Sequence, residues 1–148
     1  MNLVVDTSTF IKGTLEGDAY SEQVIKQALL GHQTLLTDEM AKELNVAIYQ
    51  VAVRKGKNPV PALRIASVYL LRSKPVRTTT RFLWCFDPDD AMFIECAIDG
   101  KADVVISNDR SLTKLKAYVT DEYARSLIRP INFMTPEEFI QAFFLMPF

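Results

Sequence analysis

Short apolar runs alternate along the chain with longer segments in which apolar residues recur every three or four positions. The short runs are typical of buried parallel strands, and the longer segments are typical of helices. We predict strands at residues 2–6, 34–36, 104–107 and 129–133. We predict helices at 19–31, from Thr37 to near Gly56, at 63–71, 87–99 and 110–117, and a final helix opened by a capping box at Thr135. The pattern at residues 75–86 fits either a strand or a loop.

Strands that alternate with helices favour a three-layer α/β/α fold around a mainly parallel sheet of roughly five strands. The 148 residues fit a single domain spanning 1–148 with one hydrophobic core. Hydrophobic residues make up 49% of the chain and charged residues 24%, which is typical of a folded protein and excludes a disordered one.

Several features together predict a cytoplasmic location. No apolar stretch approaches the roughly 18–20 residues of a membrane span. The N-terminus has no basic segment before its apolar residues and reaches Asp6 at once, so it does not resemble a signal peptide. Cys85 and Cys96 lie among apolar neighbours, and we expect a reduced, buried pair rather than a disulfide or metal site.

The most informative polar residues are acids at the ends of predicted strands. Asp6 closes the first apolar run, and Asp109 follows the run ending at Ile106 by three positions. If both runs are parallel strands, both acids reach the carboxyl edge of the sheet, where open α/β folds bind ligands. Oxygen ligands without histidine or paired cysteine suit Mg²⁺ or Mn²⁺ rather than Zn²⁺.

Two further acids lie where they can join this group. Glu43 borders the apolar face of its predicted helix, and Asp90 lies one turn into the helix that follows Pro88. A structural role explains each acid as well: Asp6 and Asp109 can cap helices, and Glu43 can be solvated. In the run 87–90 we interpret Asp87 as the N-cap and Asp90 as the ligand.

Other charged residues are expected to lie away from the crevice. Asp103 precedes its strand and should lie at the opposite edge of the sheet, and we expect Glu95 and Asp99 to be solvated. The net charge of −1 does not indicate a nucleic-acid binder, although a negative pocket can lie inside a basic rim. The candidate basic clusters are Arg54, Lys55 and Lys57; Arg110, Lys114 and Lys116; and Arg72, Lys74, Arg77 and Arg81.

Several familiar kinds of catalytic site are excluded by what the sequence lacks. His32 is the single histidine, so a Ser-His-Asp triad or a Cys-His pair has no support. Neither a GxGxxG nor a GxxxxGK[ST] motif occurs, which argues against a nucleotide cofactor.

Four segments in order resemble the PIN-domain family of metal-dependent ribonucleases, over nearly the whole chain. They are the segment 3–8, the segment 36–44, the segment from Asp87 to Ala97, and the segment 101–109. The resemblance implies Asp6, Glu43, Asp90 and Asp109 as the catalytic, metal-binding acids. It places a small hydroxyl residue at Ser8. Two features depart from the family: Asn108, where Gly or Arg is common, and residues 75–86 around Trp84.

The resemblance predicts a ribonuclease that uses Mg²⁺ or Mn²⁺. One or two ions held by Asp6, Asp90 and Asp109, with Glu43 assisting, would bind the scissile phosphate and activate water for in-line attack. The products would carry 5′-phosphate and 3′-hydroxyl ends. Ser8, Asn108 and Arg110 are the residues predicted to support the acids or contact the substrate.

Two other functions remain open from the residues alone. A phosphatase with Asp6 as a covalent nucleophile would usually carry a second Asp two positions later, where this chain has Ser8. A catalytically silent module that binds RNA or protein is the other alternative. Among PIN-domain proteins some are toxins paired with an antitoxin and others process RNA, so an antitoxin or another inhibitor protein is a candidate partner.

The last ten residues, 139–148, are unusually apolar. They can close the core, or they can cover a dimer seam or receive a partner. We favour a role for this tail in closing the core, and we also expect the protein to form a homodimer.

Overall fold

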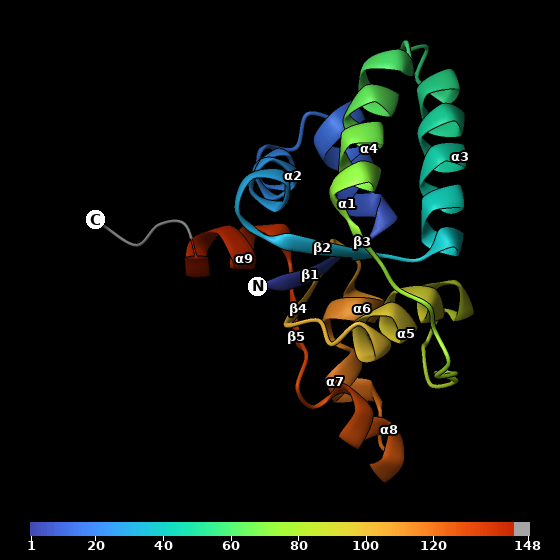
Figure 1. The fold of residues 1–148 in the computed structure, drawn as a ribbon, viewed down its shortest axis with the longest axis vertical. Coiled ribbons are helices and arrows are strands. Elements are labelled where there is room, and N and C mark those ends of the chain that lie inside the picture. Colours follow the sequence, from blue (N-terminus) through green and yellow to red (C-terminus); the bar gives the residue numbers. More distant parts are fainter. Residues whose placement is uncertain (144–148) are drawn as a thin grey trace.

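A computed structural model describes residues 1–143, and within them five strands form one parallel sheet (Figure 1). The strand order is β3-β2-β1-β4-β5, so the two strands that precede Asp6 and Asp109 lie side by side at the centre. The strands are β1 (Asn2–Val5), β2 (Gln33–Leu36), β3 (Lys74–Pro75), β4 (Val104–Ile106) and β5 (Asn132–Met134).

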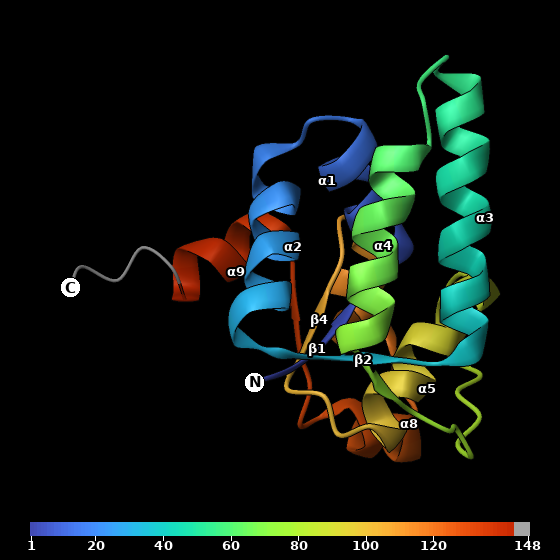
Figure 2. The same cartoon turned by 45° about the horizontal axis from the view of Figure 1, so that its top comes forward.

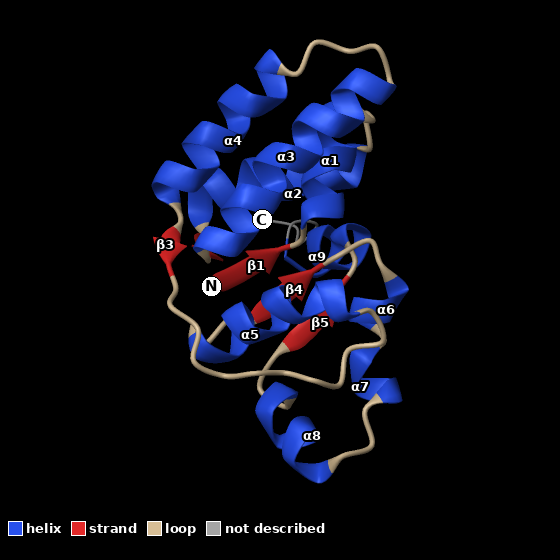
Figure 3. Cartoon of the chain, turned by 90° about the vertical axis from the view of Figure 1, so that its right-hand side faces the viewer, coloured by secondary structure: helices blue, strands red, loops and turns tan. Residues whose placement is uncertain are grey.

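Helices cover both faces of the sheet (Figures 1 and 2). One face carries α1 (Thr7–Leu15), α2 (Ala19–Gly31), α3 (Asp38–Arg54), α4 (Val60–Arg72) and α9 (Pro136–Phe143). The other carries the 3₁₀ turn η1 (Pro88–Asp90), α5 (Ala91–Asp99), α6 (Arg110–Thr113), α7 (Leu115–Tyr118) and α8 (Glu122–Ile128), as Figure 3 shows. The predicted α/β/α fold with a parallel five-stranded sheet is confirmed.

The alternation of side chains along the central strands builds the core on both faces. Leu3 and Val5 of β1 pack with residues of α2 and α9, whereas Val4 belongs to the larger cluster that includes α5. The C-terminal helix closes this core: Phe139 and Ile140 are buried. Its predicted capping box is confirmed, because Thr135 and Glu138 exchange hydrogen bonds of 3.1 and 3.2 Å. The rest of the apolar tail, 144–148, lies outside the described residues.

The observed elements differ from the predicted ones mainly in short helices. Neither α1 nor α8 was predicted, and the segment 110–117 forms two helices that break at Lys114 rather than one. The last strand lies at Asn132–Met134, whereas the prediction placed it at 129–133.

The structure also places the segment 75–86, which sequence patterns left undecided. After β3 the chain runs without regular structure to Asp87, and we call residues 76–87 the strap.

The strap is held against α5 by two carboxylates that were predicted to be solvated, and that prediction is wrong. The backbone amides of Thr79 and Thr80 donate to Asp99 at 2.6 and 2.9 Å. The amide of Phe82 donates to Glu95 at 2.9 Å, and Glu95 is buried. Because the strap lies across this face of α5, its unpaired amides need acceptors there.

Cys85 and Cys96 are both free thiols, as predicted, although only Cys96 is fully buried. Within residues 1–143 no helix is long and apolar enough to cross a membrane.

Candidate active site at the carboxyl edge of the sheet

The four predicted acids line one cavity of about 390 Å³ at the carboxyl edge of the central strands. Asp6 follows β1 directly, Asp109 follows β4, Glu43 projects from α3 and Asp90 ends η1. We call this space the acid cavity. Asp87, Asp89 and Glu16 also line it, and Lys12 of α1 is the cation among its lining residues. The structure thus brings together side chains that are up to 103 positions apart, from Asp6 to Asp109.

Asp6 is the most enclosed of these acids, with 4% of its surface exposed. Its Oδ1 accepts the amide of Thr9 at 2.9 Å and so caps α1, and its Oδ2 accepts the hydroxyls of Ser8 (2.9 Å) and Ser107. Burial raises the pKa of Asp6, and these hydrogen bonds partly oppose that rise. The capping role and the cavity-lining role therefore belong to the same carboxylate.

Two serines connect three of the acids in a continuous chain of hydrogen bonds. The Ser107 hydroxyl donates to Asp6 and accepts the amide of Asp109 at 2.9 Å. Ser111 donates its amide to Asp109 at 2.9 Å and its hydroxyl to Asp90 at 2.8 Å. This chain fixes the relative positions of Asp6, Asp109 and Asp90, although the three come from separate parts of the sequence.

Glu43 is held by the first helix. The hydroxyl of Thr7 donates to its Oε2 at 2.6 Å, which turns the side chain from α3 toward the sheet edge. Burial raises the pKa of Glu43, the Thr7 hydrogen bond lowers it, and the nearby charges of Asp6 and Asp89 raise it further. Glu43 was predicted to border the apolar face of its helix, and the structure places it there, half-buried beside the core residue Leu44.

Asp90 shows the effect of crowded negative charge. Its pKa is raised to about 6, first by burial and then by the charges of Asp109, Asp87 and Asp6, while the hydrogen bond from Ser111 opposes the rise. Asp87 caps η1 by accepting the amide of Asp89 at 3.0 Å, as predicted. A cation bound in the cavity would relieve this repulsion.

The carboxylates share a cavity, but within residues 1–143 no three acidic, histidine or cysteine side chains are placed close enough together to hold a metal ion. Ser111 holds Asp90 and Asp109, and Thr7 holds Glu43, each through a hydrogen bond to an oxygen that a metal would also use. The donor set fits a hard divalent cation, because all four acids offer carboxylate oxygens and, among the described residues, neither histidine nor cysteine lines the cavity. We therefore expect the Asp90 and Asp109 side chains to turn away from Ser111 when an ion binds.

The other residues predicted for the site lie in different places. Ser8 contacts Asp6 directly. The side-chain amide of Asn108 instead donates to the hydroxyls of Thr9 and Ser21 at 3.2 Å each, which ties the β4 edge to α1 and α2. Arg110 is exposed and is not among the residues that line the acid cavity.

Sequence analysis missed four residues that build the site: Lys12, Thr7, Ser107 and Ser111. Lys12 and Thr7 lie on the unpredicted helix α1. The signal for that helix was present, because Asp6 followed by three hydroxyl residues and then Phe10, Ile11 and Leu15 fits an N-cap and one apolar face. The two serines carry no signal of their own, because a hydroxyl beside a strand end is common.

Ser107→Ala is expected to destabilise the protein by about 1–3 kcal/mol, because it removes one of the three donors to buried Asp6 and the acceptor of the Asp109 amide. Urea denaturation measures the loss. The matched control is Ser126→Ala, since Ser126 is exposed and bonds only to the Tyr123 carbonyl. Equal, small effects for the two variants would show that the Ser107 link contributes little.

Comparison with known proteins supports the same kind of site. The sequence matches the PIN domain family over residues 2–111, about three quarters of the chain, and the chain therefore belongs to that family. Because PIN domains are generally nucleases that use divalent metals, membership supports a hydrolase. All four predicted acids lie within the matched residues.

Two similar proteins extend the comparison over more of the chain. An uncharacterized protein of Methanocaldococcus jannaschii, MJ1680, is 26% identical over 97% of this chain and 92% of its own length. The crystal structure of VapBC2 from Rickettsia felis, bound to a DNA fragment from their promoter, matches with a TM-score of 0.56. The match covers 91% of this chain and 98% of that one at 10% identity, so it shows a shared fold.

Proposed function

We propose that this chain is a divalent-metal-dependent endoribonuclease that hydrolyses RNA phosphodiester bonds, and that residues 1–148 form a single PIN-like domain. The observation that carries the proposal is the gathering of Asp6, Glu43, Asp90 and Asp109 around one cavity in a PIN-domain chain. Three of these four carboxylates have raised pKa values, which is typical of functional sites.

The proposed roles follow from where each side chain lies. Asp6, Asp90 and Asp109 are the candidate ligands of Mg²⁺ or Mn²⁺, and Glu43 lines the same cavity. When bound, the ion would supply positive charge that binds the scissile phosphate and lowers the pKa of attacking water. Ser8 and Ser107 hold the Asp6 carboxylate in place. Lys12, at the same cavity, provides a cation for the phosphate backbone.

The proposed partners follow from the family and the fold. We propose RNA as the substrate, and an antitoxin or another inhibitor protein as a regulator. The likeness to VapBC2 supports the regulator as a hypothesis, because that structure is named for a toxin and antitoxin pair. The homodimer stays a prediction, which light scattering of the purified protein tests directly.

Incubation with a mixed-sequence, single-stranded RNA tests the function. Cleavage is expected with Mn²⁺ or Mg²⁺, none in EDTA, and recovery when the metal is restored. The fragments should carry 5′-phosphate and 3′-hydroxyl ends, which enzymatic end-labelling detects. RNA binding in EDTA without cleavage under either ion would favour a silent binding module. Trapping by a fluoro-metal phosphate mimic without RNA cleavage would favour the phosphatase.

A further inference from the structure

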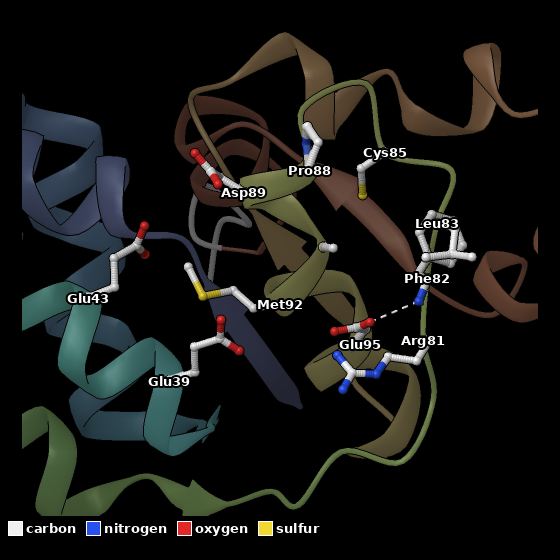
Figure 4. A pocket seen from close by; sticks show the side chains of 11 residues that line it. Glu39, Glu43, Arg81, Phe82, Leu83, Cys85, Pro88, Asp89, Met92 and Glu95 are labelled. Carbon is white, nitrogen blue, oxygen red and sulfur yellow. Dashed lines mark hydrogen bonds between the residues drawn. The ribbon is translucent and has the colours of Figure 1, made fainter.

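A second cavity of about 550 Å³, whose lining residues Figure 4 shows, shares Glu43 and Asp89 with the acid cavity. We call it the side cavity. Its volume lies within the roughly 300–1,000 Å³ that is usual for small-molecule sites. The strap, η1, α3 and α5 form its walls. A group bound here would lie next to a phosphate held in the acid cavity.

Glu95 is a buried carboxylate with unused hydrogen-bonding capacity in the side cavity. It is 8% exposed, and its Oε2 accepts the Phe82 amide at 2.9 Å. Within residues 1–143 its other oxygen accepts no hydrogen bond, and Figure 4 shows that oxygen directed into the cavity. Because this oxygen faces the cavity without a partner in the described part of the chain, it is available to accept N–H groups of a ligand.

Arg81, which lies on the strap, supplies hydrogen-bond donors and a positive charge to the side cavity. It is the cation among the residues that line the side cavity, and within residues 1–143 its guanidinium forms no ion pair. A guanidinium has five donors and no acceptor, so exposed Arg81 can bind a ligand that presents acceptor atoms. The side cavity therefore favours a ligand that carries donors for Glu95 and acceptors for Arg81.

Apolar side chains complete the walls. The side cavity is also lined by Leu83, Pro88 and Met92, beside these two charged groups. Leu83 lies on the strap and is 82% exposed. Exposed apolar side chains next to hydrogen-bonding groups suit the faces of a flat ring, as in proteins that bind unstacked RNA bases. An arginine side chain from a partner protein would offer donors only and would be repelled by Arg81.

We infer that the side cavity binds a guanine base of single-stranded RNA adjacent to the scissile phosphate. Guanine presents two neighbouring N–H donors, at N1 and N2, toward Glu95, and its O6 and N7 acceptors suit Arg81. The role of this base in RNA cleavage rests on the proposed ribonuclease function, but binding of the base does not require cleavage.

Binding can be measured without metal or RNA. In two-dimensional ¹H–¹⁵N NMR, guanosine is expected to shift the signals of the Phe82 amide and of the indole of Trp84, the single tryptophan. Adenosine, cytidine and uridine should bind at least about tenfold more weakly, because one lost set of base contacts is worth that much. Equal binding of all four nucleosides, no binding, or binding of arginine amide in preference to guanosine would overturn the inference.

Cleavage sites in a random-sequence RNA, read by sequencing, give the second measurement. The wild type should favour sites with guanine at a fixed position next to the cut, and Glu95→Gln and Arg81→Gln should each reduce that preference about tenfold or more. Glutamine at 95 can still accept the Phe82 amide, so the strap stays attached. Asp99→Asn is the matched control: it weakens the same strap from the same helix but does not line the side cavity, and it should keep the guanine preference.

The two measurements separate the failure of this inference from failure of the proposed function. RNA cleavage without base preference, together with no guanosine binding, leaves the ribonuclease and removes the guanine site. Guanosine binding without cleavage under any divalent ion removes the ribonuclease and keeps the base site. Loss of preference in Asp99→Asn as well would assign the effect to strap position and overturn the direct contact with Glu95.

Discussion

Asp6→Asn is expected to lower RNA cleavage by about a thousandfold, because a neutral amide cannot replace a carboxylate that holds a divalent ion. Asparagine can still accept the Thr9 amide and cap α1, and the hydroxyls of Ser8 and Ser107 can rotate to accept from its amide. The fold should therefore survive. Initial rates on a labelled RNA under excess Mn²⁺, with circular dichroism on the same samples, measure both properties.

The matched control is Asp103→Asn. Asp103 precedes β4 at the opposite edge of the sheet, where it accepts the amide of Asn2 at 2.8 Å, as the sequence led us to expect. Both variants remove one negative charge beside a central strand, but only Asp6 reaches the acid cavity. A similar loss of activity in both would point to a general charge or stability effect and would contradict a specific role for Asp6.

Asp90→Asn is expected to stabilise the protein in EDTA at pH 7 and to remove most of its stabilisation by Mn²⁺. The folded-state pKa of Asp90 is about 6, against an ordinary value of 3.8. A raised carboxyl pKa means that the folded state holds the proton more tightly than the unfolded state does. Stability of the metal-free wild type should therefore fall as the pH rises from about 4 to about 6, and stay low above that range.

Asparagine is neutral at every pH and removes this penalty, which is about 1 kcal/mol after allowance for solvent screening of a partly exposed group. The Tm in EDTA should rise by about 3 °C.

Mn²⁺ at about a hundred times its Kd would add roughly 2.7 kcal/mol to the free energy of unfolding of the wild type. Thermal melts with and without Mn²⁺ measure both shifts, and Asp103→Asn serves as the control, because Asp103 lies at the opposite edge of the sheet. Equal Mn²⁺ shifts in the wild type and Asp90→Asn would remove Asp90 from the site.

The layered fold could be predicted from sequence because its central elements have strong local patterns. The unbroken apolar runs around Val4 and Val105 fit strands buried on both faces, and the capping residues Thr37 and Thr135 mark helix starts that the structure confirms. The short helix α8 was missed because only Ala124 and Ile128 define its apolar face, whereas the N-cap and apolar face of α1 are present in the sequence and were overlooked. Tertiary contacts with α2 and α3 hold α1 in place, and these lie outside any local window.

The position of the acids at one edge of the sheet could be predicted from where the strands end, but the hydrogen bonds that these acids form in the structure could not. Parallel pairing of β1 with β4 brings Asp6 and Asp109 to one edge, and that follows from topology. The contacts of Thr7 with Glu43 and of Ser111 with Asp90 depend on how helices pack, which sequence spacing does not encode. For the same reason Glu95 and Asp99 were misplaced: the strap that covers them has no periodic pattern to reveal its path.

The most direct test of the account is a crystal structure of the protein with Mn²⁺, in which anomalous scattering locates the ion. The account predicts one or two ions in the acid cavity, in contact with carboxylate oxygens of Asp6, Asp90 and Asp109, with Asp90 and Asp109 turned away from Ser111. An acid cavity without manganese in crystals soaked at a concentration that supports RNA cleavage, or an ion held only by other residues, would contradict it.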